Sequence, residues 1–106
     1  MIEKKPRPKD TEGKVTKVPT GCGNMYVTLG RVDGELFEVF ATLGKAGGCA
    51  KCLLEGLTRS VTLGLRCGIP VEMFVDQLSD LRCPNPHLET LSCVDGIAKV
   101  LEGKSE

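Results

Sequence analysis

Four cysteines of this chain lie at sharp corners of the backbone that glycine, proline or serine marks. They are Cys22 in Gly21-Cys22-Gly23, Cys49 after Gly47-Gly48, Cys83 before Pro84, and Cys93 after Ser92. A cysteine that only fills a core usually lies in the apolar stripe of a helix or strand. Cysteines at the ends of elements can instead direct several sulfurs toward one tetrahedral metal ion. The pattern therefore predicts a small module centred on metal-bound or reactive thiols.

The size and charge of the chain set limits on its function. With 106 residues it is long enough for one domain with a modest core. Its 14 basic residues balance its 14 acidic ones, so no bulk field draws it to nucleic acid or anionic lipid. No apolar run is long enough to span a bilayer, and the N-terminus does not resemble a signal peptide, so we expect a cytoplasmic protein. In that compartment, six cysteines indicate metal binding or reactive thiols rather than a disulfide framework.

The chain divides into a tail, a domain and a second short tail. Residues 1–13 are charged and rich in proline, which predicts disorder. Residues 14–102 carry the alternating and helical patterns of one folded domain, and residues 103–106 form a short end.

The first part of the domain has the pattern of strands. A weak strand begins at Lys14 and is expected to end at Pro19, and residues 24–29 form a better one that is rich in β-formers. Asp33-Gly34 is a strong hairpin signal. Residues 35–42 return as a strand that places Phe37, Val39 and Ala41 on one face.

The second part has helical spacing. Between Cys49 and Cys67 we predict a helix whose apolar stripe is Leu53, Leu57, Val61 and Leu65. Gly68 and Pro70 stop it, and a second helix follows with the stripe Val71, Phe74, Val75, Leu78 and Leu81. Ser92 to Asp95 is a capping box that opens a last short helix. The order predicts an α+β fold, with a small antiparallel sheet of two or three strands and about three helices on one face.

The four corner cysteines predict a tetrathiolate zinc site formed by Cys22, Cys49, Cys83 and Cys93. The alternative that remains open is a set of thiols without metal. Cys67 follows the apolar stripe of the first helix and is assigned to the core. His87, the single histidine, is either a substitute ligand beside Cys83 or an exposed loop residue.

Cys49 and Cys52 also form a CxxC pair at a predicted helix start. In thiol–disulfide oxidoreductases this geometry lowers the pKa of the first thiol and lets the second resolve a mixed disulfide. The sequence lacks the βαβ context of those enzymes. A redox pair is therefore a second hypothesis beside the zinc site.

Two weaker hypotheses concern anions. The loop before the first helix could hold an anion through Lys45, Gly47 and Gly48, although its order is not that of a Walker A loop, and close packing of strand and helix explains the glycines as well. A nucleic-acid-binding alternative would use basic residues of the N-terminal tail, with Lys45. Those tail residues are Lys4, Lys5, Arg7 and Lys9. Neutral net charge and four aromatic residues argue against it.

Several stretches of the sequence, taken together, resemble the TSCPD domain. They are Thr20-Gly21-Cys22-Gly23-Asn24-Met25-Tyr26-Val27-Thr28 with Phe37-Glu38-Val39-Phe40, Gly44-Lys45-Ala46-Gly47-Gly48-Cys49-Ala50, Arg82-Cys83-Pro84-Asn85-Pro86, and Ser92-Cys93-Val94-Asp95-Gly96-Ile97-Ala98-Lys99. The resemblance runs in order from about residue 14 to 102. In the motif that names the domain, Leu91 and Val94 replace the threonine and proline, while Ser92, Cys93 and Asp95 are kept.

The resemblance implies a link to adenosylcobalamin-dependent ribonucleotide reductases, in which the domain lies near the C-terminus. The four corner cysteines match its motif cysteines, and Cys52 and Cys67 do not. A chain of 106 residues cannot supply a reductase barrel or a cobalamin site, so we expect a free-standing accessory module that is not catalytic alone. A reductase catalytic subunit is the implied partner, zinc the expected structural metal, and a homodimer is compatible with the exposed hairpin edge.

Overall fold

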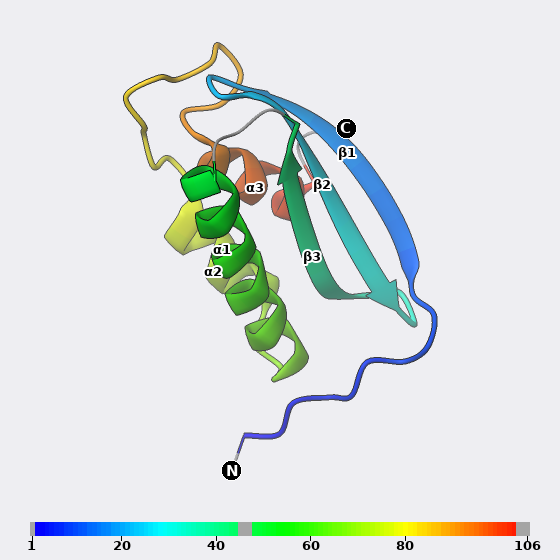
Figure 1. Ribbon diagram of the computed structural model, residues 1–106. Helices are drawn as coiled ribbons and strands as arrows, with labels where there is room; N and C mark the ends of the chain where they lie inside the picture. The colour runs from blue at the N-terminus through cyan, green and yellow to red at the C-terminus, as the bar shows by residue number, and fades with distance from the viewer. Residues whose placement is uncertain (1, 45–47, 104–106) are drawn as a thin grey trace.

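A computed structural model describes residues 2–44 and 48–103, and it places a three-stranded sheet beside three helices (Figure 1). The elements, in order, are β1 (Glu12–Thr20), β2 (Gly23–Val32), β3 (Glu35–Leu43), α1 (Gly48–Arg66), α2 (Val71–Leu78) and α3 (Cys93–Glu102). The strands are antiparallel in the order β1-β2-β3. The predicted α+β fold is confirmed. Within the described residues, no helix combines the length and apolar character that crossing a bilayer requires.

The β2–β3 hairpin has the turn that its sequence predicts. Asp33 and Gly34 both have positive φ, at 52° and 81°, which is the backbone of a type I′ turn. β1 extends one residue further than expected, to Thr20. Its Pro19 carbonyl points away from β2 and accepts a hydrogen bond from Thr90 Oγ1 at 3.0 Å. Because a proline on an edge strand removes no ladder bond, Pro19 does not end the strand.

The core lies between one face of the sheet and the helices. The strand residues that point inward, as period-2 alternation requires, are Val18, Met25, Val27, Leu29, Val39 and Leu43. The helices add the other buried side chains, which are Leu54, Val61, Leu65, Val75, Ile97, Val100 and Leu101.

The predicted helical stripes were wrong at two positions. Leu53 is 74% exposed, and Leu54 is the residue that enters the core. The inward face of α1 therefore follows Leu54, Thr58, Val61 and Leu65. Leu81 is exposed because α2 ends at Leu78 and the chain turns away before reaching it. Helical spacing alone does not say which neighbouring leucine faces the sheet or where the helix ends, and these two facts account for the two errors.

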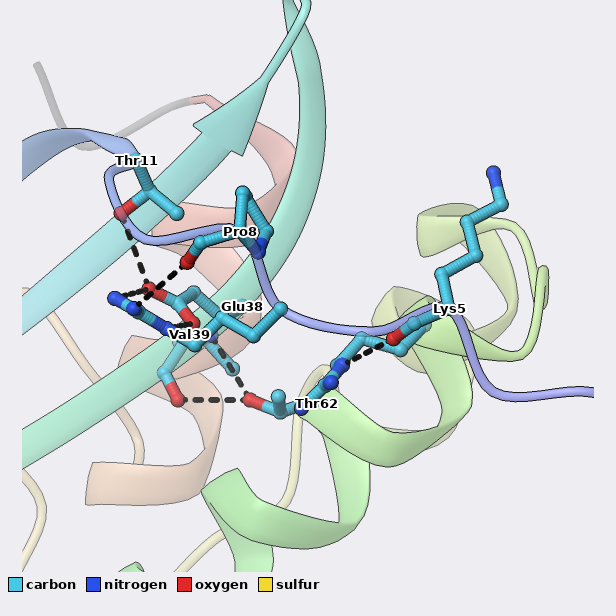
Figure 2. A network of polar contacts seen from close by, with 8 residues as sticks. Lys5, Pro8, Thr11, Glu38, Val39 and Thr62 are labelled. Atoms are coloured by element: carbon cyan, nitrogen blue, oxygen red, sulfur yellow. Dashed lines mark hydrogen bonds and ion pairs between the residues drawn. The ribbon is translucent and has the colours of Figure 1, made fainter.

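The free edge of β3 is partly covered by α1. Thr62 Oγ1 accepts a hydrogen bond from the Val39 N–H at 3.0 Å and donates one to the Val39 carbonyl at 3.1 Å (Figure 2). One side chain thus satisfies both backbone groups of Val39 on that edge. An edge strand covered in this way resists unwanted pairing.

The N-terminal segment runs across the sheet and reaches α1 (Figure 2). Arg7 binds the Glu38 carboxylate with two nitrogens, at 2.8 and 3.1 Å, and Thr11 donates to the same carboxylate at 3.3 Å. The Lys5 backbone exchanges two hydrogen bonds with Arg66 at the end of α1. We predicted a disordered tail over residues 1–13. The structure gives residues 5–11 these contacts and includes Glu12 and Gly13 in β1.

Candidate cysteine site

The turn between β1 and β2 carries Cys22 and is held by one hydroxyl group. Thr20 is buried, and its Oγ1 donates to the Gly23 carbonyl at 2.7 Å. The same oxygen accepts a hydrogen bond from the Cys22 N–H at 3.2 Å. Thr20 therefore fixes the backbone on both sides of Cys22.

The loop that contains Cys83 lies directly against this turn. The Asn85 side-chain amide donates to the Gly21 carbonyl at 2.6 Å. An ideal Cβ at Gly21 would lie only 1.5 Å from the Asn85 carbonyl oxygen. Only glycine permits this approach without a backbone shift. The glycine before Cys22 therefore lets the Cys83 loop close over the turn.

Backbone hydrogen bonds bring the two ends of the Cys83 loop together. The Cys83 N–H donates to the Leu91 carbonyl at 3.0 Å, and the His87 N–H donates to the Thr90 carbonyl at 2.9 Å. Thr90 also joins the loop to β1 through Pro19. Cys83 therefore has a defined position although its loop is neither helix nor strand.

The start of α3 carries Cys93 and is capped as the sequence predicts. Ser92 is the N-cap, and its Oγ accepts from the Asp95 N–H at 3.0 Å. The reciprocal half of the predicted capping box was wrong. The Asp95 carboxylate reaches past Ser92 and accepts from the N–H groups of Asp80 and Leu91, at 2.8 and 3.0 Å.

Asp95 is therefore a clamp for the whole loop between α2 and α3. It is 1% exposed, and Lys99 on the next turn of α3 donates to it at 2.6 Å. Burial acts to raise the pKa of Asp95, but Lys99 and the N–H groups of Leu91 and Asp80 stabilise the charged form, and the net pKa is lowered. The Asp95 carboxylate is therefore held in its charged form. It accepts hydrogen bonds from backbone N–H groups on both sides of Cys83 in this loop.

Three of the four predicted cysteines are neighbours. The Cys93 Sγ lies 3.6 Å from Thr20 Oγ1, the hydroxyl that fixes Cys22. The pKa of Cys93 is raised, first by burial and then by Cys22 and Cys83, while the hydrogen bond to Thr20 opposes the shift. The thiols of Cys22 and Cys83 thus both act on the thiol of Cys93. The β1–β2 turn, the Cys83 loop and the start of α3 meet at one end of the molecule (Figure 1).

The fourth predicted ligand, Cys49, is the second residue of α1 and is exposed, as is Cys52 one turn later. α1 begins at the same end of the molecule as the other three cysteines (Figure 1). Among residues 2–44 and 48–103, however, no three His, Cys, Asp or Glu side chains are placed to hold one metal ion. All six thiols are free. The donor chemistry suits a thiophilic ion, but the thiols as placed do not form a complete coordination sphere.

The other predicted site residues have different surroundings. Cys67 is half-buried just beyond the end of α1, and its N–H donates to the Leu63 carbonyl at 3.0 Å. His87 is half-buried, and its Nδ1 accepts from the Glu89 N–H at 3.1 Å. Of the predicted anion site, Lys45 and Gly47 lie outside the described residues, and Gly48 is the exposed first residue of α1.

Arg7 is not free to contribute to the nucleic-acid-binding surface considered above, because its guanidinium is bound to the Glu38 carboxylate.

The residues that organise the site were not expected to do so. Thr20, Asn85 and the clamp function of Asp95 all act through hydrogen bonds between distant segments. The glycine before Cys22 was a usable signal, since a glycine at a corner often permits close approach of another backbone. Nothing in the sequence indicates that Asn85 is the segment that approaches it.

Known proteins place the chain in a family. The model of the TSCPD domain matches residues 2–104. A vitamin B12-dependent ribonucleotide reductase of Bradyrhizobium diazoefficiens is 29% identical over 83 residues, which are 77% of this chain and 7% of that protein. Its counterpart in Agrobacterium fabrum is 27% identical over 75 residues, which are 70% of this chain and 6% of the relative. In Streptantibioticus cattleyicolor the values are 29% over 76 residues, or 71% of this chain and 13% of the relative.

The chain thus spans 13% or less of the length of these relatives. No solved structure matches it significantly. The family match covers nearly every residue and includes all the cysteine-bearing segments that suggested the resemblance. The chain belongs to the TSCPD domain family.

Proposed function

We propose that this chain is an accessory module of vitamin B12-dependent ribonucleotide reduction, built around a thiolate metal site and not catalytic by itself. Cys22, Cys83 and Cys93 supply three ligands, and Cys49 supplies the fourth when metal binds. Zinc is the expected ion, because tetrahedral thiolate sites select it. The named relatives are such reductases, and this chain corresponds to a small part of each.

One observation carries the metal proposal. Three segments far apart in sequence converge on the β1–β2 turn. Thr20 contacts Cys22 and Cys93, and Asn85 holds the Cys83 loop against Gly21 of the same turn. Core packing alone does not need this arrangement, because Cys22 is exposed and Cys83 and Cys93 are only half-buried. A thiophilic cation would neutralise the thiolates and fix the segments that bear them.

The test is the metal content of the chain purified without added metal, together with a count of thiols in denaturant. The proposal predicts close to one zinc per chain and six reactive thiols. Chelation should then lower the melting temperature sharply, because structural zinc sites contribute on the order of 10 kcal/mol to folding. No bound zinc, and no zinc-dependent rise in melting temperature when zinc is added, would refute the metal site.

The accessory role needs its own test. Purified chain is added to a vitamin B12-dependent ribonucleotide reductase from the same cell, and turnover and binding are measured. A change in turnover, or a saturable complex, supports the role. The chain alone should form no deoxyribonucleotide. A zinc-loaded chain that neither binds the reductase nor alters its rate would refute the accessory role while leaving the metal site intact.

A second candidate function is thiol–disulfide transfer by Cys49 and Cys52. The observation that favours it is the exposure of both thiols in the first turns of α1, three residues apart on one side of a helix. This function predicts a reversible two-electron oxidation that Cys52→Ser abolishes without loss of fold. If the thiol count in denaturant is six after air exposure and Cys49 titrates as an ordinary thiol, the redox function is wrong.

A further inference from the structure

β3 is an edge strand, and α1 covers its free edge along only part of its length. Val39 turns both of its backbone groups toward Thr62 and away from β2. In an antiparallel pair the direction of the backbone groups alternates from one residue to the next. β2 and β3 stay in regular register from Leu29–Val39 to Met25–Leu43. Ala41 and Leu43 therefore also present their N–H and carbonyl groups to the edge, while Phe40 and Thr42 pair with β2.

α1 does not cover Ala41 as it covers Val39. One turn before Thr62, the helix presents Thr58 to the strand. The Thr58 hydroxyl donates within its own helix, to the carbonyls of Leu54 and Glu55 at 3.0 and 3.3 Å. The covered part of the edge therefore ends at Val39 and Thr62, the contact drawn in Figure 2. Beyond it, no side chain of the described residues makes such a contact with the Ala41 backbone.

A groove of about 200 Å³ lies at this uncovered stretch, between β3 and the first half of α1. Its floor is apolar and buried, with Leu43 and Leu54 at 3% and 5% exposure. Its rims are exposed and consist of Phe40 and Thr42 on the strand and Lys51 and Glu55 on the helix. An open strand edge beside an apolar floor is the geometry by which folded domains add an extended peptide to a sheet.

The charges on the helix rim are not balanced. Glu55 is paired with Arg59 at 3.2 Å, whereas Lys51 forms no ion pair with any described residue. Lys51 also lies in the first turn of α1, where the helix dipole is positive and no acidic residue opposes it. The end of the groove near Lys51 is therefore electropositive and complements an acidic group.

The geometry favours a lone strand over a second copy of this chain. The β3 edge of any copy carries α1 against it through the Val39–Thr62 contact. Pairing two such edges at Ala41 would bring two α1 helices, one from each copy, to the same seam. A single extended peptide brings no helix to that seam.

We propose that this groove binds an extended peptide of a partner protein as a fourth strand beside β3. Ala41 exchanges backbone hydrogen bonds with the peptide, one apolar side chain contacts Leu43 and Leu54, and an acidic residue lies beside Lys51. No cysteine is among the described residues that line this groove, and the proposal does not rest on the proposed function.

Hydrogen exchange of the free chain, measured residue by residue, is the first test. The Ala41 amide should exchange much faster than the amides of Phe40 and Thr42, which already pair with β2. Equal protection at all three positions in a monomer would overturn the proposal. So would a dimer that protects Ala41, because a second copy would then occupy the groove.

The second test uses peptides selected from a random library displayed on phage and then synthesised. The proposal predicts alternating apolar residues with an acidic end, and binding that protects the Ala41 amide. Ala41→Pro removes the outward N–H and should weaken binding about tenfold or more, while Ala41→Ser keeps the N–H and should bind as the native chain does. Lys51→Glu should weaken the binding of peptides with an acidic end. It should not weaken the binding of analogues in which lysine replaces the acidic residue.

The Ala41→Pro variant could lose binding because it misfolds. A series of backbone-methylated peptides tests the same hydrogen bonds on the native chain and avoids this problem. On the native chain, N-methylation at alternate peptide positions should abolish binding, and methylation at the positions between should not. Uniform tolerance of methylation, or no selected peptide that protects Ala41, would overturn the proposal.

Discussion

The Asn85 side-chain amide donates to the Gly21 carbonyl at 2.6 Å, across 64 positions of sequence. This contact joins the turn that bears Cys22 to the loop that bears Cys83. It depends on the missing side chain of Gly21, because a Cβ there would meet the Asn85 backbone. The two cysteine segments are thus held together by contacts that contain no sulfur.

Gly21→Ala should therefore destabilise the fold and weaken metal binding together. Overpacking of a close contact typically costs about 1–3 kcal/mol. The matched control is Gly13→Ala in β1, where a Cβ would have no neighbour nearer than 3.9 Å. Urea denaturation and zinc titration of both variants check the prediction. If Gly21→Ala unfolds at the same urea concentration as Gly13→Ala, the close approach of Asn85 is not a constraint.

Asp95 should make stability depend on pH in the acid range. Its pKa is lowered in the folded chain, so its contribution is present above the ordinary aspartate pKa of about 4 and is lost as pH falls through the folded value. Asp95→Asn should flatten that part of the stability curve. Asp95→Ala should cost roughly 1–3 kcal/mol at neutral pH, because it leaves the backbone N–H groups of Asp80 and Leu91 without their acceptor.

Chemical denaturation of the three chains from pH 3 to pH 7, about the range that brackets the aspartate pKa, measures this dependence. Asp76→Asn on the exposed side of α2 serves as a control for the loss of one charge. Parallel curves for native chain and Asp95→Asn would contradict the clamp.

Arg7→Ala should lower the urea midpoint, although Arg7 lies outside every helix and strand. The Glu38 side chain is 4% exposed and would lose its two-point partner, while its hydrogen bond from Thr11 would remain. An arginine that holds a buried carboxylate contributes more than one in an exposed pair. The control is Arg59→Ala, whose pair with Glu55 is exposed on both sides. Equal midpoints for the two variants would show that the N-terminal segment does not stabilise the domain.

Much of the fold could be predicted from local patterns. The Asp33-Gly34 turn, the faces of the third strand and the Ser92 cap all follow from residues a few positions apart. The errors arose where distant contacts decide. Nothing near Leu53 in sequence says that the neighbouring Leu54 faces the sheet.

The proximity of three cysteines was predictable in the same measure. Residue type and corner positions identified Cys22, Cys83 and Cys93, which the fold brings together. The supporting hydrogen bonds from Thr20, Asn85 and Asp95 span distant segments, so no local pattern reveals them.

Thr20→Val should reduce metal affinity while the sheet remains folded. It removes the hydroxyl that holds the Cys22 N–H and contacts the Cys93 thiol. Residues that orient metal ligands typically change affinity by about 10–100-fold. Thr20→Ser keeps the hydroxyl and should restore most of the affinity, as competition with a zinc chelator would measure. Failure of serine to recover what valine loses would assign Thr20 to packing alone.

The most direct measurement of the central claim is a cobalt(II) titration of the reduced chain and its single cysteine variants. Thiolate ligation of tetrahedral cobalt gives intense charge-transfer absorption that scales with the number of bound sulfurs. We predict one cobalt per chain, with reduced absorption for Cys22→Ser, Cys49→Ser, Cys83→Ser and Cys93→Ser and unchanged spectra for Cys52→Ser and Cys67→Ser. A spectrum without thiolate absorption, or one that depends on Cys52 or Cys67 and not on Cys22, Cys83 and Cys93, would contradict the account.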